Sequence, residues 1–244
     1  MYFEDYILFL VALLACMIFA GWASRKVKTA YTAFATVKTR TNMTGYDTAV
    51  RLLRANGVTD IAVNRVKGTL TDHYHPTKKV VNLSQTTYGD NSVAAVAVVA
   101  HEIGLVMQKK KKYLPYQIRT ALVPVANFGS VIAIPLVIIG VLLELFVGGN
   151  SETSLGFTVA IVGVAFYGAA TLFQLVTLPV ELNASKRALT MLVEEGIIEE
   201  DETYGAKKVL SAAALTYVAG LATSLVYFFR FLIWVLSIFG RRRR

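Results

Sequence analysis

The sequence contains little charge and almost no cysteine. Cys16 is the single cysteine among 244 residues, so a disulfide framework is excluded and we interpret this thiol as a packing residue. Charged residues make up 17% of the chain and hydrophobic residues 55%, with a mean hydropathy of +0.53. This composition excludes an ordinary soluble domain and indicates an integral membrane protein with a modest polar part.

The N-terminus lacks the basic leader of a secretory signal peptide. The first apolar stretch, Tyr6–Ala23, follows the acidic residues Glu4 and Asp5. Signal peptides begin with a positively charged segment, so we interpret this stretch as a membrane helix that is retained.

Two further apolar stretches, Ala121–Val147 and Leu155–Leu178, are long enough to cross the roughly 30 Å hydrocarbon core of a bilayer. The three stretches contain no charged residue near their middle, only Glu144 near one end, which argues against an ion pathway or transporter. A fourth stretch, Ala212–Phe239, begins with small residues and includes Arg230. We therefore expect three or four membrane helices.

The net charge of +9 is concentrated in one region, since 16 of the 25 Lys and Arg residues lie between Arg25 and Arg119. The positive-inside rule places this region in the cytoplasm. A complete fourth span would put Arg241–Arg244 on the other side, so the sequence favours a fourth helix that lies on or dips into the membrane. No nucleic-acid-binding motif accompanies the basic residues, so the expected partner is the lipid bilayer and not nucleic acid.

One run of basic residues is interpreted first as a topology signal beside a membrane helix. Anionic lipid headgroups are the alternative partner. The run is Lys109, Lys110, Lys111 and Lys112.

The cytoplasmic region has the pattern of a small α+β unit. A short amphipathic helix begins near Thr44 and stops at Asn56-Gly57, and apolar runs at Ile61–Val63 and Lys79–Ser84 predict short strands. An apolar helix over Val93–Gln108 follows, with candidate N-caps just before it and the lysine run at its end. The predicted division is a membrane helix (1–23), the cytoplasmic α+β unit (24–119), a two-helix membrane hairpin (120–178), a cytoplasmic helix with an acidic linker (179–208) and a C-terminal membrane-associated helix with a basic tail (209–244).

The helix over Val93–Gln108 contains the beginning of a zinc-protease motif. In H-E-x-x-H, two histidines four residues apart face the same way and bind one zinc, while the glutamate acts on the metal-bound water. His101 and Glu102 match this motif, but Leu105 stands at the position of the second histidine. A leucine has no lone pair to offer, so the motif lacks one ligand.

A catalytic zinc needs three protein ligands, and the chain has three histidines in all. Because Leu105 has no lone pair to offer, a carboxylate ligand must come from elsewhere in the chain. Glu181 is the best candidate because it follows Pro179 at the cytoplasmic mouth of the third span. From its position alone, Glu181 could instead stabilise the N-terminus of a helix that begins there.

Several segments of the chain together resemble the YugP-type family of bacterial membrane zinc metallopeptidases, almost from end to end. They are Leu70–Tyr74, Val93–Ala95 with His101–Gly104, Ala121–Ser130, Leu175–Glu181 with Asn183–Ser185, and Ala213–Val218.

The resemblance implies a multi-pass protein of the bacterial cytoplasmic membrane, mainly α, with a small zincin-like α+β catalytic unit on the cytoplasmic side. It implies a Zn²⁺ cofactor bound by His101, by the residue at position 105 and by Glu181, with Glu102 as general base. The expected reaction is hydrolysis of peptide bonds in membrane or membrane-proximal proteins. The oligomeric state does not follow from the sequence.

Leu105 departs from the implied ligand set. Loss of one of three ligands is expected to cost several kcal/mol of metal affinity. His73 or His75 could replace it from a loop at the end of a strand, or both could simply be loop histidines.

We also expect the edge of the Val80–Ser84 strand to hold a substrate peptide as an added strand, or else this strand is only part of the sheet. The candidate residues for such peptide binding are Val81, Asn82 and Leu83.

Three functions remain from the sequence. The first is a membrane zinc metallopeptidase impaired or inactivated by Leu105. The second is a pseudoprotease that binds peptides or acts as a scaffold in the membrane, and the third is a structural membrane protein or transporter.

Overall fold

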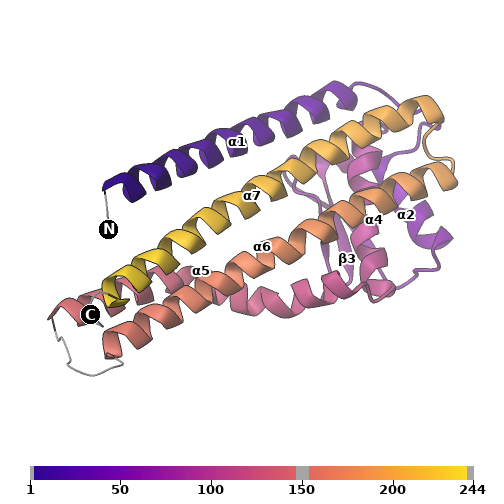
Figure 1. Ribbon diagram of the computed structural model, residues 1–244. Coiled ribbons are helices and arrows are strands. Elements are labelled where there is room, and N and C mark those ends of the chain that lie inside the picture. The colour runs from indigo at the N-terminus through magenta and orange to yellow at the C-terminus, as the bar shows by residue number, and fades with distance from the viewer. Residues whose placement is uncertain (1–2, 147–153, 241–244) are drawn as a thin grey trace. The chain divides into compact units, whose positions relative to one another are not determined.

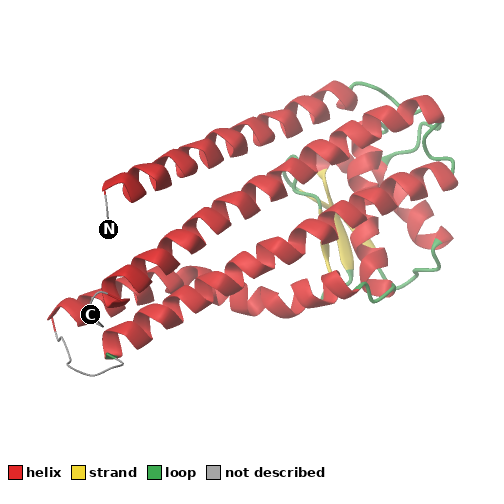
Figure 2. Ribbon diagram, in the orientation of Figure 1, coloured by secondary structure: helices red, strands yellow, loops and turns green. Residues whose placement is uncertain are grey.

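The computed structural model describes residues 3–146 and 154–240 (Figures 1 and 2). The chain divides into two compact units. The helical unit comprises Met1–Ala20, Ile118–Thr177 and Val218–Arg244, and the α/β unit comprises Gly21–Gln117 and Leu178–Tyr217. In chain order the elements are α1 (Phe3–Ala35), α2 (Gly45–Ala55), β1 (Ala62–Val66), β2 (His73–His75), β3 (Val80–Ser84), α3 (Gln85–Tyr88), α4 (Val93–Lys110), α5 (Leu114–Phe146), α6 (Leu155–Glu194) and α7 (Glu200–Gly240).

Within the described residues, four helices, α1, α5, α6 and α7, are long and apolar enough to cross a membrane. The three stretches expected to span lie in α1, α5 and α6, with Val147 outside the described residues. The fourth stretch belongs to α7, which is continuous and satisfies the same criteria of length and composition. That this helix lies on or dips into the membrane stays a prediction, and Arg241–Arg244 lie outside the described residues.

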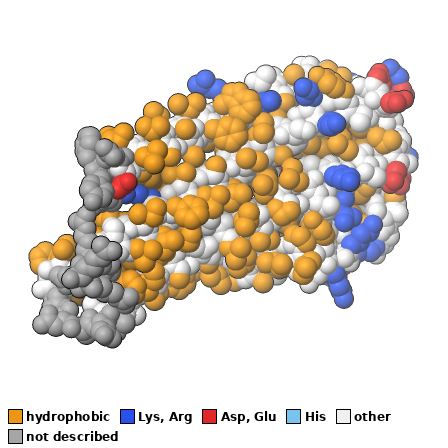
Figure 3. All heavy atoms as spheres, viewed as in Figure 1, with side chains coloured by type: hydrophobic (Ala, Val, Ile, Leu, Met, Phe, Trp, Pro, Cys, Tyr) orange, Lys and Arg blue, Asp and Glu red, His pale blue; other side chains and the backbone are white. Residues whose placement is uncertain are grey.

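In the helical unit, small residues let α5 and α6 approach closely. A Cβ atom added at Gly156 would lie 2.6 Å from the carbonyl oxygen of Gly140, so neither position has room for a side chain. Such contacts are typical of helices that pack within a bilayer. Glu144, only 4% exposed, accepts a hydrogen bond from the Ser154 hydroxyl. Hydrophobic side chains cover much of the visible surface of the long helices, as lipid contact requires (Figure 3).

The short helix α2 begins and ends where the sequence predicts. Thr44 is its N-cap, and the Thr44 hydroxyl and the Asp47 carboxylate form a reciprocal capping box. Asn56 is the C-cap, and Gly57 follows with a φ of +61°, a conformation that glycine adopts at little cost.

The sheet has three strands in the order β1-β3-β2, with β1 parallel and β2 antiparallel to β3. The strands predicted from the two β-branched runs are β1 and β3. The interpretation of His73 and His75 as loop residues is wrong, because both lie in β2 and pair with Asn82 and Val80. The hydrogen-bonding edges of β3 are therefore both occupied.

The helix α4 passes through the core of the α/β unit. Its residues Val96, Val99 and Ile103 are fully buried, and Val81 and Leu83 of β3 are fully buried as well. Burying one such side chain contributes about 1.5–3 kcal/mol, so this core fixes α4 firmly. Ser92 caps the start of α4 by accepting a hydrogen bond from the Ala95 N–H, and Lys109 and Lys110 form its last turn, as predicted.

Two residues of the lysine run have structural roles. Lys110 Nζ donates to the carbonyl oxygens of Asn56 and Gly57, both at 2.7 Å, and Lys109 Nζ donates to the Pro76 carbonyl at 2.6 Å. These contacts join the end of α4 to two loops of the α/β unit. The role of the run as a topology signal or lipid contact stays a prediction.

Candidate metal centre

The predicted site lies in the α/β unit, where α4 contacts the part of α6 that follows Leu178. This contact depends on a glycine. A Cβ atom added at Gly104 would lie 2.6 Å from the Ala184 carbonyl oxygen, so only a glycine permits this approach. The close contact places His101 and Gln108, which precede and follow Gly104 on α4, next to polar side chains of α6.

The structure brings His101 and Glu181 together, although 80 residues separate them in the sequence. His101 Nε2 lies 3.0 Å from Glu181 Oε2, and the Glu181 side chain is only 3% exposed. His101 Nδ1 lies 3.1 Å from Ser185 Oγ. Both ring nitrogens of His101 therefore face polar atoms of α6.

The environment of Glu181 corrects one interpretation. Glu181 does not begin a helix, because α6 runs without a break from Leu155 to Glu194 with Pro179 inside it. A carboxylate in the middle of a helix cannot stabilise an N-terminus, since that effect falls off within the first turn. The helix continues past Pro179 even though proline removes one backbone hydrogen bond.

Glu102 is buried and contacts the backbone of β2. It is 8% exposed, and its Oε2 accepts a hydrogen bond of 2.8 Å from the Tyr74 N–H. Burial raises the pKa of Glu102 above its ordinary value, although His101 and the Tyr74 hydrogen bond act in the opposite direction. The strand β2 thus fixes the position of this carboxyl group.

The segment before β2 is held in place by Asp72. Its carboxylate accepts hydrogen bonds from the Ser84 N–H at 2.8 Å, from the Ser84 hydroxyl at 2.9 Å and from the Thr87 hydroxyl at 3.2 Å. Asp72 therefore links the entrance of β2 to the end of β3, and it orients the strand whose backbone contacts Glu102.

The structure does not bring His73 or His75 into the site, so neither is the predicted substitute ligand. The ring nitrogens of His73 contact the Thr71 carbonyl oxygen at 2.8 Å and the Asn82 amide at 3.0 Å. His75 Nδ1 accepts from the Lys78 N–H at 3.3 Å. The physical reason is their strand: pairing of β2 with β3 fixes both residues in the sheet.

The donor set at the site is incomplete for a catalytic zinc. Two ligands on a tetrahedral zinc, each about 2.0–2.1 Å from the ion, lie roughly 3.3 Å apart, so a separation of 3.0 Å suits His101 and Glu181 as neighbouring ligands. Leu105, one helical turn beyond His101, offers no donor. Among residues 3–146 and 154–240, no group of three or more His, Cys, Asp or Glu side chains could hold a metal ion. The residues present therefore do not fit a three-ligand zinc.

Two residues of the site, Ser185 and Gln108, were not predicted from the sequence. Ser185 lies four residues after Glu181, and Gln108 lies seven after His101, so each shares a helix face with a predicted ligand. Gln108 Nε2 donates to the Val180 carbonyl oxygen at 2.7 Å and to Asn183 Oδ1 at 3.1 Å. Helical spacing from the ligands is the signal that could have identified both.

The predicted peptide-binding residues do not form an open edge. Val81 and Leu83 are fully buried, and Asn82 Nδ2 contacts His73. Because β3 is the central strand, it cannot accept an added strand on either side. The prediction for Val81, Asn82 and Leu83 is therefore wrong, and the edge strands of this sheet are β1 and β2.

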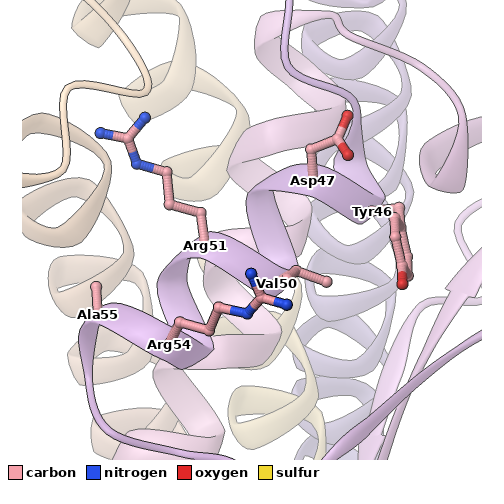
Figure 4. A pocket seen from close by; sticks show the side chains of 6 residues that line it. All are labelled: Tyr46, Asp47, Val50, Arg51, Arg54 and Ala55. Carbon is pink, nitrogen blue, oxygen red and sulfur yellow. The ribbon is translucent and has the colours of Figure 1, made fainter.

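A surface hollow lies along α2, and none of the predicted ligands lines it (Figure 4). Its single carboxylate, Asp47, belongs to the capping box, and Arg51 contacts the Glu195 backbone carbonyl. These contacts have structural roles, so the hollow adds nothing to the site. It is lined by Tyr46, Asp47, Val50, Arg51, Arg54 and Ala55.

Comparisons with known proteins place the whole chain beside zinc peptidases. Residues 8–236 match the model of a family described as "Putative neutral zinc metallopeptidase". The chain is 42% identical over 230 residues to a protein of Bacillus subtilis (strain 168) named "Putative membrane protease YugP", covering 94% of this chain and 97% of that protein. No solved structure gives a significant match.

Proposed function

Because the chain belongs to the neutral zinc metallopeptidase family, we propose that it is a membrane peptidase-type protein in which Leu105 leaves the zinc site incomplete. In this proposal the α/β unit faces the bacterial cytoplasm and receives peptide segments of membrane or membrane-proximal proteins. Hydrolysis is slow or absent, so the protein chiefly binds such segments.

The observation that supports this proposal is the pair formed by His101 and Glu181. A nitrogen and a carboxylate oxygen, the donor types of a zinc site, lie 3.0 Å apart in the interior of the α/β unit. Leu105 occupies the position at which a third donor would face the same point, because residues four apart share a helix face. Binding by two donors instead of three is expected to be weaker by several kcal/mol.

In this proposal Glu102 is the general base, as the zinc-protease motif implies, and the Tyr74 N–H holds its carboxyl group. The low exposure of Glu102 keeps bulk water from its carboxyl group.

The proposal is tested by returning a histidine to position 105. We expect the unmodified protein, purified in detergent, to bind far less than one zinc per chain and to show no chelator-sensitive cleavage of an unfolded protein such as casein. The Leu105→His variant is expected to bind about one zinc and to gain chelator-sensitive cleavage. Leu105→Phe is the matched control, because it supplies a ring of similar size without a lone pair.

Two outcomes contradict the proposal. Stoichiometric zinc and chelator-sensitive cleavage in the unmodified protein would show that Leu105 does not impair the site. A folded Leu105→His variant that binds no more zinc than Leu105→Phe would reject the pair of His101 and Glu181 as ligands.

A further inference from the structure

The side-chain amide of Asn127, on α5 in the helical unit, has no hydrogen-bonding partner among residues 3–146 and 154–240. Asn127 is exposed, and so is Ser130, which lies nearly one turn further along the helix. The Ser130 hydroxyl already donates to the Asn127 backbone carbonyl at 3.0 Å. The hydroxyl is therefore satisfied within α5, whereas the amide still has N–H donors and a carbonyl oxygen to pair.

This amide lies close to the middle of a helix that is long and apolar enough to cross a membrane. The helix α5 runs from Leu114 to Phe146, so Ser130 is its middle residue and Asn127 lies about 5 Å from the midpoint along the axis. With α5 across the bilayer, the amide is in the hydrocarbon layer, where no water can pair with it. An unpaired polar group costs free energy there, and a partner that hydrogen-bonds at the same depth removes this cost.

Exposed apolar side chains continue from Asn127 along one face of α5. Val131, Ile134 and Ile138 follow at intervals of four, three and four residues, and they are 72%, 44% and 47% exposed. This spacing is that of the contact seam between two helices in a left-handed coiled coil, which is also the commonest way that membrane helices pack. We call these four residues the α5 stripe. The face of α5 that contacts α6 is a different one and includes Gly129.

A second copy of this chain is the partner whose chemistry matches the α5 stripe. Copies inserted into one membrane have the same orientation, so a two-fold axis relating them runs along the membrane normal and α5 meets α5 in parallel. Asn127 of one copy then lies at the same depth as Asn127 of the other. A carboxamide both donates and accepts, so the two amides form reciprocal N–H···O hydrogen bonds. A helix of an unrelated membrane protein carries no polar group at this depth as a matter of symmetry.

We propose that two copies of this chain pair in the membrane through the α5 stripe, with the two Asn127 amides hydrogen-bonded to each other. The amide pair fixes the register of the two helices, as a single polar residue does in the seam of a coiled coil. The inference takes from the proposed function only that α5 crosses the membrane, and it does not depend on the zinc site.

Disulfide cross-linking in the membranes of expressing cells tests which face of α5 is the interface. Cys16→Ala removes the single cysteine of the chain, and each variant then receives one new cysteine. Ile138→Cys and Ile139→Cys are a matched pair, because these two isoleucines are 47% and 48% exposed and point about 100° apart around the helix. A disulfide requires Cα atoms within about 7 Å, so we expect an oxidant to yield covalent dimer mainly from Ile138→Cys. Equal yields, or a higher yield from Ile139→Cys, would overturn the proposal.

The contribution of the amide is measured by sedimentation equilibrium of the purified full chain in density-matched detergent micelles. Asn127→Leu removes the amide at similar size and is expected to weaken the dimer by about 3–30-fold, the effect of a hydrogen bond between membrane helices. Asn127→Gln keeps an amide and is expected to retain most of the affinity. Ser130→Ala is the control, because its hydroxyl is already bonded within its own helix, and it should leave the dissociation constant unchanged.

Two results of this measurement would refute the pairing. One is an unmodified chain that stays monomeric at all concentrations, which would leave the stripe to a different membrane protein or to lipid. The other is an unchanged dissociation constant in a folded Asn127→Leu variant. Neither result alters zinc binding by the Leu105→His variant, so this proposal and the proposed function fail independently.

Discussion

The contact at Gly104 allows the sharpest test of the site, because the change Gly104→Ala adds a single carbon. The new Cβ atom would lie 2.6 Å from the Ala184 carbonyl oxygen, about 0.8 Å closer than an ordinary contact of 3.4 Å. The crowding atom belongs to the backbone of α6 and cannot rotate away. The helices α4 and α6 must therefore separate by a comparable distance.

This separation has two measurable consequences. Overpacking of a tight contact costs about 1–3 kcal/mol. The distance between His101 Nε2 and Glu181 Oε2 is 3.0 Å, and a shift of about 0.8 Å takes it beyond the range of a hydrogen bond. We therefore expect Gly104→Ala to lower stability and to alter the ¹⁵N signals of His101.

Gly21→Ala is the matched control. Replacing glycine by alanine in a helix gains about 1 kcal/mol through propensity alone, and a Cβ atom at Gly21 in α1 meets nothing within 4 Å. The difference in unfolding free energy between Gly104→Ala and Gly21→Ala is therefore the cost of the crowded contact alone, about 1–3 kcal/mol. At roughly 2–4 °C per kcal/mol, thermal unfolding in detergent should give Gly104→Ala a Tm lower by about 2–12 °C than Gly21→Ala. Equal Tm values and unchanged His101 signals would refute the close approach of α4 to α6.

Three further predictions concern the α/β unit. Lys110→Met removes the two hydrogen bonds to the end of α2 and should lower stability by about 1 kcal/mol in thermal unfolding. The control Lys111→Met should change stability by less than about 0.5 kcal/mol. Equal effects of the two variants would contradict the structural role of Lys110. Asp72→Ala leaves three donors without their acceptor and should cost about 2–3 kcal/mol, an expectation that fails if its denaturant midpoint is unchanged. Burial opposes ionisation of Asp90, but hydrogen bonds from Lys38 and a neighbouring serine outweigh it and lower its pKa. Asp90 therefore contributes stability at neutral pH that is lost as the pH falls through the lowered pKa, and in unfolding curves between pH 7 and 3 the Asp90→Asn variant should lose less stability than the unmodified chain.

Local sequence patterns predicted many of the elements. The caps at Thr44 and Ser92, the stop at Asn56-Gly57 and the apolar stretches in the long helices depend on contacts within a few residues of the chain. Propensity and capping act over that range, so the sequence is sufficient for them. The path of the chain around Pro179 was not predicted, because tertiary packing allows α6 to continue through a residue that usually ends a helix.

The strand order could not be read from the sequence. The segment His73–His75 is too short and too polar for a strand pattern, and it becomes one because β3 offers it an edge. That pairing places β3 in the centre and removes Val81, Asn82 and Leu83 from any peptide-binding edge. It also fixes His73 and His75 away from the candidate metal site.

The sequence by itself determined the chemistry that is available: a histidine and a glutamate on a buried helix, a leucine in place of a third donor, and apolar helices of bilayer length. Only the tertiary structure decided which groups meet. Glu181 reaches His101 because Gly104 has no side chain to hold α6 away, and Ser185 reaches the other ring nitrogen because it lies one turn further along the same face. The sequence specifies each side chain, whereas the distance between two helices depends on every atom packed between them.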